Sequence, residues 1–322
     1  MRADPQESRP PVVVVTGPTA SGKTALAVEL ALEFDGEIVN ADSVQVYRYL
    51  DIGTAKPGPE LRARVPHHML DVVNPKVSYS AGRYAVAARA AAAAIHAKGR
   101  TVVLTGGTGL YIRAFCEGLL AGGAADTELR DTLEREHADA VAAGEPLRLH
   151  RRLRDRDPEA AAGIHPHDLR RIIRALEIGE RSGETATARR HEHRFTDRPF
   201  TTLHLVIDPG RDALDARIDA RCRQMIESGL LQEVRALRER GYGPELRSMQ
   251  AIGYRHLGPV ADGRDTLANA QAAMQRDTRR FARRQRTWLR RVPEANWLKP
   301  DDRDQIFKLV DAMLRGGASR RS

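Results

Sequence analysis

The sequence has few of the features that stabilise small secreted domains or anchor membrane proteins. Its 322 residues include only two cysteines, Cys116 and Cys222, which lie far apart and share no short metal-ligand spacing. We therefore expect neither a disulfide framework nor a zinc site, which fits a reducing cytosol. No apolar run approaches the roughly 18 residues of a membrane span, and the opening residues lack the apolar core of a secretory signal. We expect a cytoplasmic monomer that binds no membrane.

The sequence carries more basic than acidic residues. Lysine and arginine number 52 against 43 acidic residues, a formal charge of +9, and arginine supplies most of the excess. This balance favours a polyanionic partner, but it is equally compatible with general solubility, because net charge says nothing about fold. The positions of the arginines must distinguish the two interpretations.

Short apolar runs alternate with helical patterns along most of the chain. Buried strands are predicted at residues 12–15, 37–40, 69–73, 101–105 and 203–207, with a short last strand near Trp297. This alternation is typical of an α/β fold with a parallel sheet and helices on both faces.

One long segment lacks strand-like runs and shows helical periodicity instead. We therefore predict an all-helical insert at residues 121–200, within a core formed by residues 1–120 and 201–322 that ends in basic helices. The Gly-rich stretch at 118–123 and the polar stretch at 182–199 are its predicted linkers.

The run from Val12 to Thr24 matches a phosphate-binding loop. A predicted strand leads into GPTASGKT, which fits G-x-x-x-x-G-K-[ST], and an amphipathic helical pattern follows. The loop amides and the helix N-terminus can bind phosphate, Lys23 adds a positive charge, and the Thr24 hydroxyl is a ligand for Mg²⁺. The sequence therefore predicts a P-loop NTPase-like core with a phosphate site at Gly17, Pro18, Thr19, Ala20, Ser21, Gly22, Lys23 and Thr24. The loop leaves the phosphate ligand and the reaction open.

A second polar cluster follows the predicted strand at 37–40. Ligands of doubly wound sheets bind beyond the carboxyl ends of the strands, so Asp42 should face the same crevice as the P-loop and could accept a proton there. Asp42 or Ser43 could equally cap a short helix. The stretch GGTGLY follows another predicted strand and could line the same crevice or form an ordinary turn.

His67 and His68 are adjacent in the chain. Neighbouring side chains of a strand point to opposite faces, so the two imidazoles are poorly placed to share one metal ion. We expect them to have packing or hydrogen-bonding roles.

Arginine clusters accompany two predicted helices. In the insert, Leu169, Ile172, Ile173 and Leu176 recur at helical spacing, which leaves Arg170, Arg171 and Arg174 on another face. Near the C-terminus, eight arginines between residues 274 and 291 accompany one acid, Asp277. These arginines could form solvated faces, but guanidinium groups suit phosphates and exposed bases, so we favour contact with RNA.

An apolar stripe runs along the same C-terminal helix. Met274, Phe281 and Trp288 recur every seven residues, which favours packing in the core over stacking on bases. On an earlier helix, Arg217 and Arg221 lie one turn apart. For Arg217, a diphosphate contact and a salt bridge to Asp215 or Asp219 are alternative interpretations.

The ordered motifs extend from Gly17 to about Arg291, and they are GPTASGKT, ADSVQVY, DIGTAKP, PHHMLD, GGTGLY, DLRRIIRALE, SMQAIGYRH and RRQRTWLR. With these motifs the chain resembles the bacterial tRNA dimethylallyltransferases, also called tRNA isopentenyltransferases or IPP transferases. The nearest departures are Val44, where the family often has methionine, and the additional N-terminal residues.

The resemblance implies transfer of a dimethylallyl group from dimethylallyl diphosphate to the exocyclic N6 amine of the adenosine immediately 3′ of the anticodon, with release of diphosphate. The P-loop would then bind diphosphate with Mg²⁺ and Arg217, and Asp42 would be the general base beside Thr24 and Lys23. The insert would clasp the anticodon stem-loop. The residues implied to contact tRNA are Asp42, Ser43, Val44, Gln45, Thr108, Arg130, Arg170, Arg171, Ile172, Ile173, Arg174, Gln250, Ala251, Ile252, Gly253, Tyr254 and Arg255.

Two rival functions stay open from the residues alone. A P-loop small-molecule kinase would consume ATP and would not need the arginine-rich insert. An RNA-binding NTPase or adaptor would bind RNA without altering it.

Overall fold

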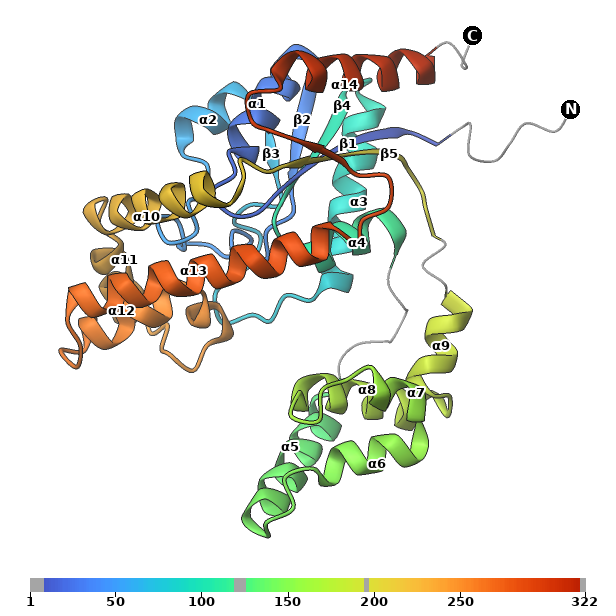
Figure 1. The fold of residues 1–322 in the computed structure, drawn as a ribbon, viewed down its shortest axis with the longest axis vertical. Coiled ribbons are helices and arrows are strands. Elements are labelled where there is room, and N and C mark those ends of the chain that lie inside the picture. The colour runs from blue at the N-terminus through green and yellow to red at the C-terminus, as the bar shows by residue number, and fades with distance from the viewer. Residues whose placement is uncertain (1–8, 119–125, 194–196, 319–322) are drawn as a thin grey trace, which may run out of the picture. The chain divides into compact units, whose positions relative to one another are not determined.

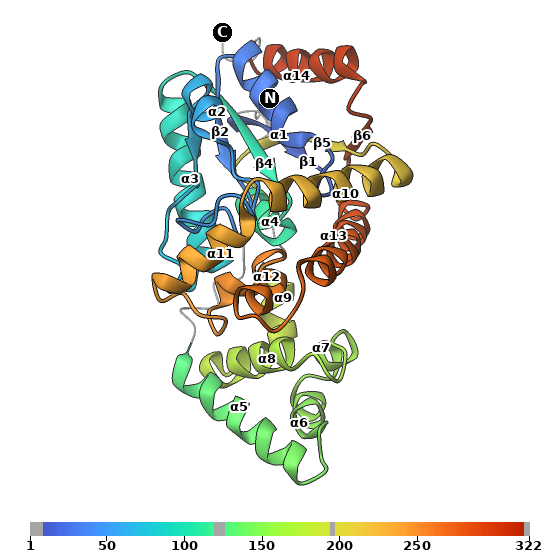
Figure 2. The ribbon, with the colours of Figure 1, turned by 90° about the vertical axis from the view of Figure 1, so that its left-hand side faces the viewer.

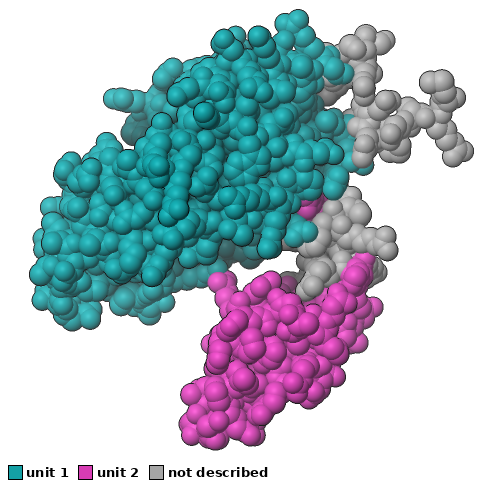
Figure 3. Space-filling model, in the orientation of Figure 1, with its two compact units in different colours: residues 1–116, 198–322 teal, residues 117–197 magenta. Residues whose placement is uncertain are grey.

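The computed structural model describes residues 9–118, 126–193 and 197–318. The chain divides into two compact units, which Figure 3 shows in different colours. Residues 1–116 and 198–322 form the core unit, and residues 117–197 form the helical unit. The predicted limits of the insert, 121 and 200, lie within a few residues of these boundaries.

The core unit contains a six-stranded parallel sheet (Figure 1). Its spatial order is β3-β2-β4-β1-β5-β6. The strands are β1 (Pro11–Thr16), β2 (Gly36–Asn40), β3 (His67–His68), β4 (Thr101–Gly106), β5 (Thr201–Ile207) and β6 (Asn296–Leu298). The predicted runs at 12–15, 37–40, 101–105 and 203–207 all fall within strands, and the last short strand contains Trp297 as predicted.

The predicted strand at residues 69–73 is wrong. The chain pairs with β2 only through His67 and His68, and Val73 makes an isolated bridge to Tyr47. Met69 and Asp71 have positive φ angles of 66° and 55°. A left-handed backbone at these positions is incompatible with an extended strand, so the run forms a bend instead, in which Met69 and Val73 are buried.

Helices cover both faces of the sheet (Figure 2). Val12 and Val14 of β1 belong to one apolar core with residues of the helices on one face, while Val13 and Val15 belong to the other core with α1 and α14. The helices of this unit are α1 (Lys23–Glu33), α2 (Pro59–Arg64), α3 (Ala81–Ala97), α4 (Gly109–Glu117), α10 (Arg211–Glu227), α11 (Leu230–Glu239), η1 (Arg247–Gln250), α12 (Tyr254–Ala261), α13 (Leu267–Leu289) and α14 (Arg303–Ala318). The predicted α/β class is confirmed. Across the described ranges, no helix is both long and apolar enough to span a membrane.

The helical unit has a core of its own. Its helices are α5 (Thr127–Ala142), α6 (Arg148–Arg156), α7 (Pro158–Ala162), α8 (Leu169–Ser182) and α9 (Ala186–His193), and no strand occurs among its described residues. The predicted apolar stripe of α8 packs here against Leu133, Leu149 and Leu153. The predicted entrance linker at 118–123 lies almost entirely outside the described residues. The predicted exit linker contains α9, which is anchored because Ala186 is buried in this core.

Candidate active site

The predicted phosphate loop connects β1 to α1. Gly17 is required by close packing, because a Cβ atom there would lie 2.3 Å from the carbonyl oxygen of Ile207. Gly22 has a φ of 92° and occupies the N-cap of α1. The first amides of α1, at Lys23 and Thr24, have no hydrogen-bond partner among the described residues. The predicted P-loop core is thus present, with the amides and the helix N-terminus available to an anion.

Lys23 supplies a cation that no carboxylate neutralises directly. Its Nζ atom donates a 3.3 Å hydrogen bond to the carbonyl oxygen of Pro18. Burial and the nearby Arg221 guanidinium lower the pKa of Lys23 to about 8, while Asp42 opposes this shift. The charged form is therefore destabilised in the free protein, and an anionic ligand would stabilise it.

Asp42 follows β2, and its two carboxylate oxygens have different surroundings. One oxygen acts as a cap, and the other is available as a proton acceptor. Oδ1 accepts hydrogen bonds from the amides of Val44 (2.8 Å) and Gln45 (3.2 Å), so it caps the turn. Oδ2 has no hydrogen-bond partner in the part of the chain that the structure describes. The cap fixes the orientation of the carboxylate and leaves one oxygen available to a ligand.

The GGTGLY stretch joins three segments of the site. The Thr108 hydroxyl accepts a 2.9 Å hydrogen bond from the amide of Ser43 and lies 3.1 Å from the Ser43 hydroxyl. A Cβ atom on Gly106 would lie 2.3 Å from the carbonyl oxygen of Ala41, and one on Gly107 would lie 2.4 Å from Nε2 of Gln285. These glycines are needed because other parts of the protein approach the backbone closely.

Two residues that the sequence reasoning did not assign to the site complete it. Arg221 lines the cleft and has no hydrogen bond or ion pair with any described residue. Gln285 is only 6% exposed, its Oε1 accepts a 2.8 Å hydrogen bond from the amide of Thr19, and its Nε2 donates a 2.9 Å bond to the carbonyl of Gly107. For Gln285, the sequence offered one indication of a role in the site, namely an uncharged polar residue among arginines on the face of α13 that is buried.

Arg217 reaches the P-loop, where its Nη1 atom donates a 3.4 Å hydrogen bond to the carbonyl oxygen of Ser21. The alternative salt bridge to Asp219 does not form, because Asp219 pairs with Arg279 of α13. Asp215 makes no ion pair within the described ranges. The diphosphate contact therefore stays the prediction for Arg217.

Most of these groups share one cleft in the core unit, although Arg217 is not among its lining residues. It is lined by Thr19, Lys23, Thr24, Ile38, Asn40, Asp42, Gln45, Thr54, Ala55, Pro57, His67, Thr105, Gly106, Gly107, Arg221, Phe281 and Gln285. The predicted packing of Met274 is confirmed, and Trp288 lies against Gly109, where a Cβ would be 2.5 Å from its ring. Phe281 departs from that interpretation because it is half-buried and forms part of the cleft wall.

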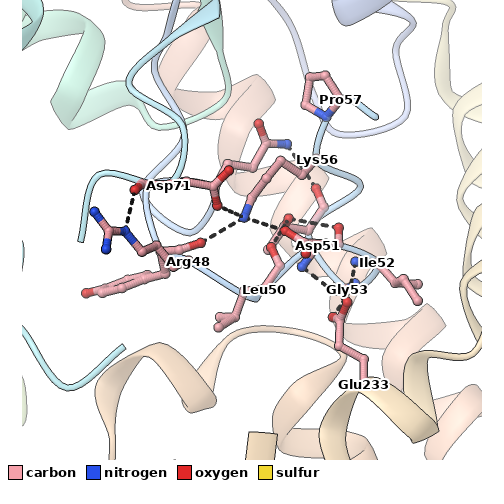
Figure 4. A network of polar contacts seen from close by, with 12 residues as sticks. Arg48, Leu50, Asp51, Ile52, Gly53, Lys56, Pro57, Asp71 and Glu233 are labelled. Carbon is pink, nitrogen blue, oxygen red and sulfur yellow. Dashed lines mark hydrogen bonds and ion pairs between the residues drawn. The ribbon is translucent and has the colours of Figure 1, made fainter. Parts of the chain in front are cut away.

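Residues 51–57 form a loop that lines another side of this cleft. Because side-chain hydrogen bonds hold it at several points, it is called here the pinned loop. The Lys56 side chain is 1% exposed, and its Nζ atom donates to Asp51 Oδ1 (2.7 Å), Asp71 Oδ1 (2.7 Å) and the Tyr47 carbonyl (2.8 Å) (Figure 4). Glu233 accepts hydrogen bonds from the amides of Asp51, Ile52 and Gly53, at 3.3, 2.8 and 3.3 Å. The DIGTAKP motif therefore builds a rigid wall, of which Thr54, Ala55 and Pro57 face the cleft.

The two histidines of β3 form hydrogen bonds, as expected. Nδ1 of His67 lies 2.7 Å from the carbonyl oxygen of Val65. Nε2 of His68 lies 2.7 Å from Oε2 of Glu37, whose side chain is 1% exposed. Burial opposes ionisation of Glu37, but hydrogen bonds from His68, Lys98 and Arg100 outweigh it and lower the pKa of Glu37 to about 2.

Several residues that the resemblance assigned to tRNA contact have buried side chains. Ile172 and Ile173 are 2% and 4% exposed in the core of the helical unit, so the prediction that they contact tRNA is corrected to a packing role. Tyr254 is 1% exposed and donates a 2.6 Å hydrogen bond to Glu233, which makes it a support of the pinned loop. Gln45 is also buried, and its Nε2 donates to the carbonyl of Thr54 at 3.0 Å.

The insert arginines differ in their surroundings. Arg170 and Arg171 are exposed. Arg130 and Arg174 both bind Oε2 of Glu177 at 2.7 Å, and the Glu177 side chain is fully buried. Burial opposes ionisation of Glu177, but these hydrogen bonds outweigh it and lower its pKa. Arg130 and Arg174 are therefore held in fixed positions at half-buried sites.

The arginines of α13 and of the two residues after it fall into three groups. Arg279 pairs with Asp219, and Arg286 lies 2.8 Å from Asp208, so both link α13 to other elements. Arg276 and Arg280 share Asp277 with Arg255. Arg283, Arg284, Arg290 and Arg291 are exposed and make no ion pair in the described structure. The last group, in which Arg290 and Arg291 directly follow the last residue of α13, is called here the free basic surface of α13.

Comparisons with known proteins agree with this architecture. The family model described as IPP transferase matches residues 45–292. A tRNA dimethylallyltransferase of Desulfatibacillum aliphaticivorans is 47% identical over 307 residues, which cover 95% of this chain and 99% of that protein. The solved tRNA isopentenylpyrophosphate transferase of Bacillus halodurans has a TM-score of 0.69 at 35% identity, covering 97% of this chain and 98% of that one. A eukaryotic dimethylallyltransferase acting on tRNA has a TM-score of 0.79 at 28% identity, covering 92% and 75%. The chain therefore belongs to the IPP transferase family.

Proposed function

We propose that the chain transfers a dimethylallyl group from dimethylallyl diphosphate to the exocyclic N6 amine of the adenosine immediately 3′ of the anticodon in tRNA. Its relatives are named for this activity. One observation supports the proposed reaction, in which diphosphate leaves and the amine loses a proton. The unpartnered amides and cation of the P-loop and the unpartnered oxygen of Asp42 belong to the same cleft, so an anionic leaving group and a proton acceptor can act on one substrate pair.

In the proposed reaction, the amine nitrogen forms a bond to the allylic carbon while the bond between that carbon and the diphosphate oxygen breaks. The electron pair leaves with diphosphate. Lys23, Arg217 and Arg221 would stabilise the negative charge that grows on the leaving group. Lys23 and Arg217 already donate hydrogen bonds to carbonyl oxygens of the P-loop in the free protein, so these two cations need little reorganisation during the reaction.

Asp42 would take the proton that the amine must lose. The lone pair of an adenine amine is delocalised into the ring, so removing the proton as the new bond forms helps the nitrogen to react. The two amide hydrogen bonds to Oδ1 orient the carboxylate, and Oδ2 is left to accept the proton. Positioned proton transfer of this kind contributes about 10² to 10⁴ in rate.

Mg²⁺ fits the residues of the cleft. The described residues include no group of three or more histidine, cysteine, aspartate or glutamate side chains that could hold a metal ion. Thr24 lines the cleft, and Mg²⁺ binds few protein ligands and is held together with substrate phosphates and water. Thr24 would hold it, and its charge would help to neutralise the diphosphate.

Exposed arginines support tRNA as the acceptor. In the helical unit these are Arg170 and Arg171, and in the core unit they belong to the free basic surface of α13. Exposed guanidinium groups can bind backbone phosphates, which gives affinity that falls steeply with salt.

The test is to incubate the protein with tRNA, Mg²⁺ and dimethylallyl diphosphate and to look for the mass of the added dimethylallyl group on the adenosine by mass spectrometry. Lys23→Ala should lose most of the transfer. Turnover of ATP at a rate typical of kinases without allyl transfer would identify a kinase instead. Binding of tRNA without any added mass would identify an adaptor.

A further inference from the structure

His67 and Thr105 belong to the cleft but have no part in the chemistry described above. Across the described residues, only a few buried side-chain polar atoms lack a hydrogen-bond partner, and these include Nε2 of His67 and Oγ1 of Thr105. Both residues line the cleft, beside Thr24 and Asn40. Leaving a buried polar group unsatisfied costs about 1–3 kcal/mol, so two such atoms in one cleft call for a ligand.

The hydrogen bond of His67 determines which of its nitrogens carries the proton. Nδ1 lies 2.7 Å from the carbonyl oxygen of Val65, and a carbonyl oxygen can only accept. Nδ1 must therefore be the donor. Burial lowers the pKa of His67 below its usual value, which favours the neutral ring. In the neutral ring Nε2 then has a free lone pair and can only accept a hydrogen bond.

The partner of Nε2 must therefore be a hydrogen-bond donor, such as a water molecule or a group of a bound ligand. β3 pairs with β2 in register, so that His67 lies next to Ile38, and Ile38 packs on the face of the sheet that α1 covers. This face carries Lys23 and Thr24 at the start of α1. The donor is thus expected at the diphosphate end of the cleft, where Mg²⁺ would retain some of its water.

We propose that His67 is a positioning residue that accepts a hydrogen bond from a water molecule of the Mg²⁺–diphosphate complex, and that the Thr105 hydroxyl forms a hydrogen bond with the same complex. The proposal rests on the proposed function, because it requires diphosphate and Mg²⁺ in this cleft. It predicts that the environment of Nε2 of His67 changes when diphosphate binds with Mg²⁺ and does not change when RNA alone binds. Partners of this outer kind typically change metal affinity about 10- to 100-fold when they are mutated.

Two substitutions of His67 distinguish the donor role of Nδ1 from the acceptor role of Nε2. His67→Asn keeps a donor near the Nδ1 position for the Val65 carbonyl and removes the acceptor at Nε2. His67→Gln places an amide oxygen near the Nε2 position and keeps the acceptor. His67→Asn should weaken Mg²⁺-dependent diphosphate binding about 10-fold, and His67→Gln should restore much of it. Thermal unfolding of both variants controls for the fold.

The experiment uses the full chain with ¹⁵N-labelled histidine. NMR of the free protein should show a protonated Nδ1 and an unprotonated Nε2 for His67, with the resonance assigned by its loss in His67→Gln. The Nε2 shift should move on addition of diphosphate with Mg²⁺. It should stay unchanged with diphosphate and a chelator, or with an anticodon stem-loop RNA alone.

Three results would overturn the inference, namely a protonated Nε2 in the free protein, a shift that responds to RNA alone, and equal Mg²⁺-dependent affinity in wild type and His67→Asn. Calorimetry with diphosphate distinguishes these outcomes from failure of the proposed function. If wild type binds diphosphate with Mg²⁺ while His67→Asn binds equally well, only the role of His67 is wrong. If wild type does not bind diphosphate at all, the proposed function and this inference fail together.

Discussion

Replacing Lys56 by methionine tests whether the wall at residues 51–57 is held by one buried cation. The substitution keeps the length of the side chain and removes three hydrogen bonds at once. The carbonyl of Tyr47 loses its donor at a buried residue, which costs about 1–3 kcal/mol. Asp71 is 33% exposed and keeps Arg62 at 2.9 Å, and Asp51 is 59% exposed, so each carboxylate adds about 1 kcal/mol at most. We expect a loss of about 2–4 kcal/mol in the free energy of unfolding.

Urea unfolding followed by tryptophan fluorescence is the appropriate assay, because both tryptophans, Trp288 and Trp297, lie in the core unit. Lys98→Met is the matched control. Lys98 is 54% exposed, and its partner Glu37 retains Arg100 at 2.9 Å and His68 at 2.7 Å, so the control should lose less than about 1 kcal/mol. If Lys56→Met is no less stable than the control, the wall is held by Glu233 and by packing, and the reasoning about Lys56 is wrong.

Three further predictions concern the site. Asp42→Asn keeps the cap to Val44 but cannot take the proton, so single-turnover transfer with saturating substrates should fall about 10² to 10⁴-fold, and a rate within a few-fold of wild type would leave Asp42 as a cap only. Because anion binding favours charged Lys23, whose pKa is about 8, affinity for diphosphate should be retained below pH 8 and should fall as the pH rises through 8. Calorimetry should show no such loss in Lys23→Met, and the same loss in both proteins would assign it to the ligand. An Arg290→Ala, Arg291→Ala double variant should reduce the slope of log affinity for tRNA against log salt by about 0.9 per lost phosphate contact, and an unchanged slope would exclude these contacts.

How much could be predicted from the sequence depended on how local the signal was. The strand, loop and helix of the P-loop are contiguous, so the motif predicted the fold of that segment and the roles of Lys23 and Thr24 could be stated directly. The run at 69–73 was local too, but its apolar pattern could not reveal the left-handed backbone at Met69 and Asp71. An apolar pattern indicates which side chains are buried, and a bend that buries Met69 and Val73 can produce it as well as a strand does.

The carboxylate of Asp42 could not be interpreted from its position alone. From the sequence, capping and proton transfer are alternative roles. A carboxylate has two oxygens, however, and in the structure Oδ1 caps the turn while Oδ2 has no partner among the described residues. The cap also explains why an aspartate is suited to the proposed role, because the same hydrogen bonds that stabilise the turn aim the second oxygen. A structural role for one atom is therefore compatible with a chemical role for its neighbour.

The least predictable feature was which arginines are free. A salt bridge from Arg217 to Asp219, two residues away, was one interpretation, but Asp219 pairs with Arg279, sixty residues further along the chain. Gln285 lies on the same helix as Arg279, and it accepts a hydrogen bond from the P-loop amide of Thr19, 266 residues away in the chain. α13 therefore does two things that its charge count cannot reveal. Its buried face neutralises Asp219 and Asp208 and braces the phosphate loop, which leaves Arg217 and Arg221 available to an anion, while its exposed face keeps guanidinium groups for a polyanion. A single arginine-rich helix thus contributes both to diphosphate binding and to RNA contact, and only the tertiary partners of each arginine separate the two.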